Sequence, residues 1–176
     1  PALAAGCTMV VKPASQTPFS ALALAELGER AGLPAGVMSV LAGTSSEIGS
    51  EMTSNPIVRK LTFTGSTEIG KVLMKQCADT VKKATMELGG NAPFIVFDDA
   101  DLDDAVEGAL ASKYRNAGQT CVCANRLLVQ DGVYDTFLDK LASAVSAMKV
   151  GKGTDDGVMI GPLIDQAAVA KTEEHI

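Results

Sequence analysis

Hydrophobic and polar positions follow two patterns, which alternate along this chain. Short apolar and β-branched runs, typical of strands, occupy residues 8–11, 37–41, 60–64, 85–88, 93–97 and 126–130. Longer Ala- and Leu-rich or amphipathic stretches, typical of helices, occupy residues 19–31, 44–55, 68–79, 102–116 and 134–148. Strands that alternate with helices of these lengths predict an α/β fold with a largely parallel sheet.

Residues at the predicted helix ends support these bounds. Thr17 stands where an N-cap is expected before a proline, and Gly32 follows the same helix as its stop. Thr44 and Glu47 have the spacing of a capping box. The acidic run 98–101 suits the start of a further helix, because carboxylates are favourable at helix N-termini.

Composition and charge narrow the class of protein. Of 176 residues, 47% are hydrophobic and 20% charged, which is typical of soluble globular proteins. Four cysteines are too few for a disulfide scaffold, so we expect a cytoplasmic protein. A net charge of −6 argues against general affinity for nucleic acid or membranes, because both demand a basic surface. No apolar run approaches the ~18 residues of a membrane span. The chain opens at Pro1 without an initiator Met and closes within a predicted helix, so both ends look cut.

Two kinds of catalytic centre are excluded by residue counts. The single histidine, His175, cannot complete a Ser-His-Asp triad or a His-rich metal site. Cys121 and Cys123 resemble half of a metal clip, but no second Cys/His pair completes it. We therefore predict no metal.

Two strand ends suggest a nucleotide site, because ligands of α/β sheets lie beyond the carboxyl ends of strands. Gly65 would let the backbone approach a phosphate closely, and Ser66 could donate a hydrogen bond to it. On these residues alone, a tight turn with an N-cap is the favoured alternative, since G-x-G-x-x-G spacing is absent. Lys12 ends a buried-looking strand, where its charge could meet a ribose or phosphate or simply be solvated.

Cys121 carries the strongest local signal of chemistry. It lies on a glycine-containing turn between a predicted helix and a predicted strand, where a thiol is expected to be exposed. On this evidence alone, a reactive cysteine and a packed cysteine are equally compatible with the position. Cys7 and Cys77 lie among apolar or helical residues and are interpreted as structural. Glu87 precedes two glycines at the end of an apolar strand, where a carboxylate is costly to bury. It suits a general base, with an ion pair as the alternative.

Three motifs in this order resemble the aldehyde dehydrogenase family, and the resemblance covers essentially the whole chain. They are Phe-Thr-Gly-Ser-Thr at 63–67, Met-Glu-Leu-Gly-Gly-Asn-Ala-Pro at 86–93 and Gly-Gln-Thr-Cys at 118–121. Residues 12–27 and 116–126 look like the succinate-semialdehyde branch in particular. That branch implies oxidation of succinate semialdehyde to succinate, a step of 4-aminobutyrate degradation.

The resemblance implies a role for each candidate catalytic residue. Cys121 would attack the aldehyde carbon, and hydride transfer to the nicotinamide would leave a thioester on its sulfur. Glu87 would activate the water that hydrolyses the thioester. The backbone N–H of Cys121 would form part of the oxyanion hole. Cys123 is a possible redox partner of Cys121, although an extended chain holds residues i and i+2 near the ~7 Å limit for a disulfide.

The resemblance also implies how cofactor and substrate are held. Gly65 and Ser66 would meet the cofactor's phosphates, Lys12 its adenine ribose, and Leu88 would also contact the cofactor. Ser15 replaces a glutamate that is common in NAD-preferring relatives, which implies NADP, with NAD possible.

Arg115, six residues before Cys121, looks like the arginine that holds the substrate's distal carboxylate. Its alternative role is a favourable charge at a helix C-terminus.

The predicted fold is aldehyde dehydrogenase-like, with parts of two Rossmann-like open twisted parallel-sheet domains. Residues 1–89 would be the second part of the cofactor-binding domain, and residues 90–176 the first part of the catalytic domain. The family's oxyanion-hole asparagine would lie before Pro1, and its nicotinamide-ribose glutamate and oligomerisation strands after Ile176. The parent enzyme is expected to be a homo-oligomer. A non-catalytic fragment and an aldehyde dehydrogenase of other specificity remain alternatives.

Overall fold

The computed structural model describes residues 1–176 and falls into two compact units. Pro1–Phe63 and Glu68–Met86 form the first unit, and Thr64–Thr67 and Glu87–Ile176 form the second. The chain passes from the first unit to the second after Phe63 and again after Met86, and returns to the first after Thr67. The predicted division at residue 89 stays a prediction. The functional roles assigned to the two parts stay predictions. No helix is both long and apolar enough to cross a membrane.

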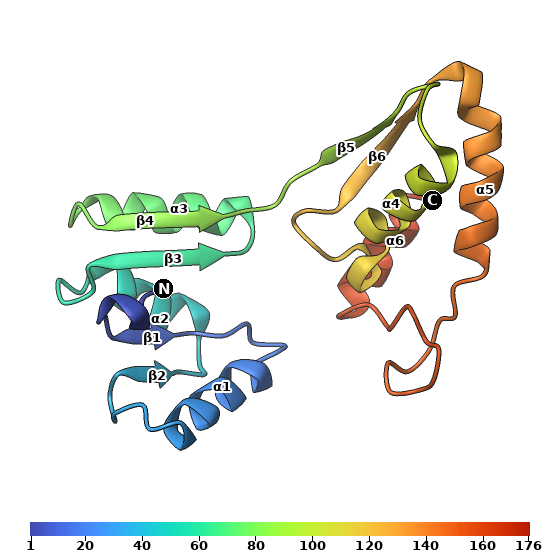
Figure 1. Ribbon diagram of the computed structural model, residues 1–176. Helices are drawn as coiled ribbons and strands as arrows, with labels where there is room; N and C mark the ends of the chain where they lie inside the picture. Colours follow the sequence, from blue (N-terminus) through green and yellow to red (C-terminus); the bar gives the residue numbers. More distant parts are fainter. The chain divides into compact units, whose positions relative to one another are not determined.

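The first unit is built from strand–helix–strand segments (Figure 1). Strand β1 (Met9–Val11) pairs in parallel with β2 (Met38–Val40), and helix α1 (Phe19–Arg30) connects them. Strand β3 (Lys60–Thr64) pairs with β4 (Lys83–Glu87) in a second two-stranded sheet. Helices α2 (Ser45–Ser54) and α3 (Thr67–Ala78) accompany this sheet. The short helix η1 (Leu3–Ala5) precedes β1.

The core of the first unit lies between the β3–β4 sheet and the two helices beside it. Leu61, Leu73 and Cys77 are buried there, and three half-buried side chains pack against them: Met52, Phe63 and Met86. Cys77 is therefore a packed cysteine, as predicted. Cys7 is exposed, so its interpretation as a packed residue was wrong. The turn that follows η1 leaves its thiol outside any core cluster.

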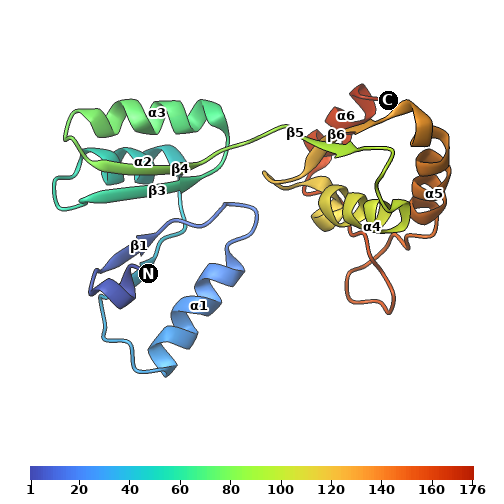
Figure 2. The same ribbon diagram turned by 45° about the horizontal axis from the view of Figure 1, so that its top comes forward.

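The second unit is also a parallel pair of strands covered by helices (Figure 2). Strand β5 (Ala92–Val96) pairs with β6 (Ala124–Val129), with a register shift between Ala92 and Pro93. Helices α4 (Leu102–Lys113) and α5 (Tyr134–Ser146) pack on this sheet, and η2 (Arg115–Gly118), η3 (Asp131–Val133) and α6 (Gln166–Glu174) complete the unit. Its buried core comprises Val96, Val106, Ala109 and Phe137.

Two of the predicted helix ends have the expected chemistry. Gly32 has φ +86°, and its N–H donates to Glu29 O while Leu33 N–H donates to Gly28 O. These two hydrogen bonds end α1 in a Schellman motif, in which glycine is preferred at the left-handed position. The carboxylate of Asp101 caps α4 by accepting hydrogen bonds from the main-chain N–H groups of Asp103 and Asp104.

Two predicted N-caps are corrected by the structure. Pro18 is the N-cap of α1 and already has helical angles, so Thr17 lies one residue too early to cap. Thr44 does occupy the N-cap of α2, but its hydroxyl makes no capping bond. Its main-chain carbonyl accepts from Ile48 N–H instead. The capping-box spacing thus located the helix start without the side-chain bond.

Candidate active site

The loop that carries Cys121 begins where α4 ends, three residues earlier than predicted. Asn116 and Ala117 have φ +53° and +55°, and Gly118 has φ +76°. Three successive left-handed residues cannot continue a right-handed helix, so α4 stops at Lys113. Such a conformation costs about 1–2 kcal/mol for each non-glycine residue, and strain of this kind clusters at functional sites.

Gly118 is favoured by its positive φ angle, and the space beside it is tight. A Cβ at this position would lie 3.1 Å from the carbonyl oxygen of Lys113. The same carbonyl, at the end of α4, accepts a hydrogen bond from Cys123 Sγ at 3.3 Å. The backbone of the loop is therefore folded tightly around this carbonyl, which explains the glycine in the Gly-Gln-Thr-Cys motif.

The two cysteines of this loop face different surroundings. Cys121 is exposed, whereas Cys123 is 1% exposed and is held against Lys113 O. Both are free thiols. Cys121 is thus the one of the pair that can meet a substrate, and Cys123 is part of the packing beneath it.

The segment between β4 and β5 approaches the Cys121 loop at Gly90. A Cβ at Gly90 would be 3.2 Å from the carbonyl oxygen of Cys121, so any larger residue would have to displace this carbonyl slightly. Asn125 links the two segments, because its Nδ2 donates to Gly90 O at 3.5 Å. Lys113 Nζ in turn donates to Asn125 Oδ1 at 3.2 Å. The structure therefore brings Gly90, in the segment that follows Glu87, to the loop of the predicted nucleophile.

Glu87 lies at the end of β4, and its side chain is exposed and makes no ion pair. The expected cost of burying this carboxylate is therefore absent. Its main-chain carbonyl accepts from Gly65 N–H at 3.0 Å. Gly65 and the exposed Ser66 directly precede α3, and Leu88 follows Glu87 as a half-buried residue. Four predicted site residues thus lie at one end of the β3–β4 pair.

The remaining predicted site residues lie apart from these four in the sequence. Lys12 and Ser15 follow β1, and Lys12 Nζ donates to Ser15 Oγ at 3.3 Å. A cation and a hydroxyl are therefore held together at a strand end. Arg115 is exposed at the start of η2, two residues beyond α4, and takes part in neither of the structure's two ion pairs. Its guanidinium is available to a ligand.

Sequence reasoning missed Gln119, which organises the Cys121 loop. Its Nε2 donates to Asn116 O at 3.2 Å, and its Oε1 accepts from Ile164 N–H at 2.9 Å. The second partner is 45 residues away in the sequence. No local pattern can indicate a partner at that separation, so only the three-dimensional structure reveals it.

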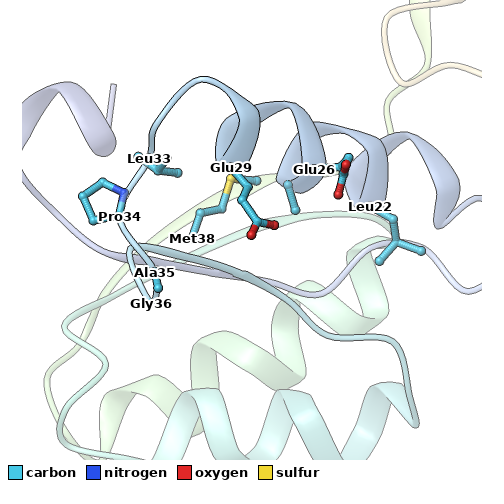
Figure 3. A pocket seen from close by; sticks show the side chains of 9 residues that line it. Leu22, Glu26, Glu29, Leu33, Pro34, Ala35, Gly36 and Met38 are labelled. Atoms are coloured by element: carbon cyan, nitrogen blue, oxygen red, sulfur yellow. The ribbon is translucent and has the colours of Figure 1, made fainter.

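Two surface pockets lie away from these residues. One, of ≈ 440 Å³, lies beside α1 in the first unit (Figure 3). It is lined by Leu22, Ala25, Glu26, Glu29, Leu33, Pro34, Ala35, Gly36 and Met38. The other, of ≈ 510 Å³, lies between α4 and α5. Neither includes a predicted site residue, and no three potential metal ligands gather anywhere in the chain.

Comparisons with known proteins agree with the motifs. The succinate-semialdehyde dehydrogenase [NADP(+)] of Escherichia coli and the glutarate-semialdehyde dehydrogenase of Pseudomonas aeruginosa are each 74% identical over 176 residues. The 3-sulfolactaldehyde dehydrogenase of Pseudomonas putida is 67% identical. Each alignment covers 100% of this chain but only 36% of the relative. This chain therefore spans about 36% of the length of these relatives.

Solved structures share the fold over nearly the whole chain. The crystal structure of an Escherichia coli NADP-dependent enzyme superposes with a TM-score of 0.97 at 74% identity, covering 99% of this chain and 36% of that one. A Staphylococcus aureus betaine aldehyde dehydrogenase, solved with NAD+ and a BME-modified cysteine, gives 0.92 at 40% identity, covering 99% and 35%. The aldehyde dehydrogenase family itself matches residues 1–176. The chain belongs to the aldehyde dehydrogenase family.

Proposed function

We propose that this chain provides the nucleophile, the general base and much of the cofactor site of an NADP-dependent succinate-semialdehyde dehydrogenase. The observation that carries the proposal is the exposed Cys121 on a strained loop, whose main-chain carbonyl lies close to Gly90 in the segment that follows Glu87. Strained backbone, an accessible thiol and an unpaired carboxylate together fit covalent catalysis better than they fit a structural turn.

The proposed chemistry begins at the Cys121 sulfur. Its thiolate attacks the aldehyde carbon, forming a C–S bond, while the carbonyl oxygen takes up the negative charge. The N–H of Cys121 donates to that oxygen. A bound NADP+ would supply the hydride acceptor, and loss of the hydride from the former aldehyde carbon would leave Cys121 acylated as a thioester. Glu87 then removes a proton from water, which attacks the thioester and releases the carboxylic acid and the free thiol.

The residues proposed to hold the cofactor fit an anionic ligand. Lys12 and Ser15 present a cation and a hydroxyl 3.3 Å apart after β1. Gly65 and Ser66 stand before α3, a helix of 12 residues whose first N–H groups favour phosphate. A serine at position 15 places no negative charge against a 2′-phosphate, which supports NADP. The name of the 74% identical Escherichia coli relative specifies the same cofactor.

The relatives' names support a class of substrates and do not single out one compound. Succinate semialdehyde, glutarate semialdehyde and 3-sulfolactaldehyde are all short aldehydes with an anionic group at the far end. Arg115, exposed and without an ion-pair partner, suits that group, because a guanidinium binds carboxylates through a planar fork. Within this class we propose succinate semialdehyde, since residues 12–27 and 116–126 resemble that branch.

The proposal is tested in what we call the complete enzyme, residues 1–176 within a chain of the relatives' full length. We compare kcat/KM for succinate semialdehyde and for uncharged butyraldehyde, with NADP+. A charge-assisted arginine contact contributes roughly 1.5–3 kcal/mol, so the acid should be preferred by about 10- to 150-fold. Arg115→Ala should remove most of this preference, and Arg115→Lys should restore part of it.

Two results would overturn parts of the proposal. If Arg115→Ala lowers both kcat/KM values equally, Arg115 is structural and the substrate returns to an unspecified aldehyde. Cys121→Ala should abolish turnover while NADP+ still binds. Cys7→Ala, at the other exposed thiol, is the matched control and should leave turnover unchanged. Turnover in Cys121→Ala would refute the covalent mechanism.

A further inference from the structure

Gln119 connects two parts of the second unit that are far apart in the sequence. On one side its Nε2 and its main-chain N–H both donate to Asn116 O, at 3.2 and 3.1 Å. On the other side its Oε1 accepts from Ile164 N–H at 2.9 Å. Ile164 precedes Asp165, whose side chain caps α6 by accepting from Ala168 N–H at 2.9 Å. The side chain of Gln119 therefore ties the Cys121 loop to the start of α6.

The loop needs such a tie because its backbone is strained. Asn116 and Ala117 are left-handed without being glycine, and such residues persist only where their surroundings over-determine them. The Asn116 side chain contributes a further bond, from Nδ2 to Gln119 O at 3.2 Å. Asn116 and Gln119 thus hold each other across the left-handed turn. Only Gln119 extends this arrangement to another segment of the chain.

Gln119 fixes the loop before Cys121 in the sequence, and a second residue fixes it after Cys121. Cys123, two residues after Cys121, is buried and bonded to Lys113 O. Between these anchors, Cys121 and Val122 are exposed, Val122 to 67%. Hydrogen-bonded residues before and after Cys121 therefore fix both ends of the segment that carries its exposed side chain. Loss of the hydrogen bonds of either Gln119 or Cys123 would make the position of the Cys121 thiol less well defined.

We propose that Gln119 is a positioning residue for the nucleophile: through Ile164 N–H it holds the Cys121 loop in its attacking geometry. This inference rests on the proposed function, since it concerns the reactivity of Cys121. Gln119 acts on the loop and not on the substrate. A misplacement of about 1 Å can lower the rate of a chemical step by about 100-fold, so a bond outside the reacting groups can still control the rate.

The test compares isosteric variants in the complete enzyme. Gln119→Met keeps the volume of the side chain and removes both of its bonds, whereas Gln119→Glu keeps an acceptor for Ile164 N–H. Gln130→Met is the matched control, because Gln130 also makes two side-chain bonds, to Asp98 N–H and Asp98 Oδ2, both at 3.0 Å, at the far end of β6. The rate of amide hydrogen exchange at Ile164 reports whether its N–H is still hydrogen-bonded to residue 119. The rate of the pre-steady-state burst of NADPH reports the reactivity of Cys121.

Gln119→Met should speed exchange at Ile164 and lower the burst rate by about 10- to 100-fold, with NADP+ affinity unchanged. Gln119→Glu should recover part of the burst rate, and Gln130→Met should change neither reading. Faster exchange with a wild-type burst would overturn the inference, because the tie would then be structural only. Unchanged exchange would overturn it as well. Retained turnover in Cys121→Ala refutes the proposed function by a separate variant, so the two failures are distinguishable.

Discussion

Glu87 shows how far a single residue's surroundings can be judged from the sequence. Its motif and its place at the end of β4 were both predicted, but the burial that made it suitable as a base is absent. An exposed carboxylate without an ion pair can still take a proton from water once a substrate excludes solvent. Its proposed role therefore depends on the thioester stage of the reaction.

We expect Glu87→Gln to slow deacylation rather than hydride transfer. In the complete enzyme, the pre-steady-state burst of NADPH should persist, while steady turnover falls about 10²–10⁴-fold, the range for a lost general base. Stopped-flow measurement of NADPH formation separates the two phases. Glu107→Gln, at an exposed carboxylate on α4, is the matched control and should alter neither phase. A lost burst would mean that Glu87 activates Cys121 instead.

Ser15 decides the choice of cofactor in the proposed function. Ser15→Glu should weaken NADP+ much more than NAD+, because a carboxylate would face the 2′-phosphate across a short gap. Lys12 would then pair with the new carboxylate and no longer be free for the phosphate. Titration of both cofactors with the complete enzyme gives the two dissociation constants. If both rise by the same factor, Ser15 does not face the ribose.

At the scale of elements, regular segments were predictable and interruptions were not. β3 was predicted at its observed bounds, Lys60–Thr64, because a run between clear turn signals defines both ends. α4 was predicted to reach Asn116 because its composition stays helical. The left-handed turn that ends it depends on the space around Lys113 O and on a partner at Ile164. Neither is visible in the local sequence.

The loop between α4 and β6 also bears on the possible Cys121–Cys123 disulfide. In the structure both thiols are free, and Cys123 Sγ is bonded to Lys113 O, so a bridge requires the loop to bend and this bond to break. We expect inactivation by peroxide to be reversed by a thiol reductant. Cys123→Ala should make it irreversible, because the sulfenic acid of Cys121 would oxidise further. Cys7→Ala should behave like the wild type, and irreversible loss in the wild type would exclude the switch.

At the scale of the whole molecule, the two units explain why fold class was easier to predict than architecture. Alternating strands and helices correctly indicated α/β structure with parallel pairs. Each of the three sheets nevertheless has only two strands. The number of strands in a sheet depends on which other segments are present, and this chain spans about 36% of the length of its relatives. The pattern within the chain carries no information about those segments.

The last prediction concerns residues 1–176 expressed alone. Two-stranded sheets are marginal by themselves, and Ile95, Phe97 and Leu128 on or beside the β5–β6 pair are 55%, 60% and 53% exposed. Such residues indicate a surface that further chain would cover. We expect the isolated chain to bind a hydrophobic dye strongly and to produce no NADPH from succinate semialdehyde and NADP+, because the family's remaining oxyanion and nicotinamide contacts are expected elsewhere.

Absorbance of NADPH and fluorescence of the dye give the two readings, and intact mass verifies the length of each chain. The complete enzyme serves as the positive control and should bind less dye per mole while turning over. The isolated Cys121→Ala chain sets the background, since any NADPH it forms cannot come from the thiol. Turnover by the isolated chain at a rate comparable to the complete enzyme's would show that residues 1–176 already contain every group the reaction requires. The division of the active site between this chain and further segments would then be wrong, even with Cys121 as the nucleophile.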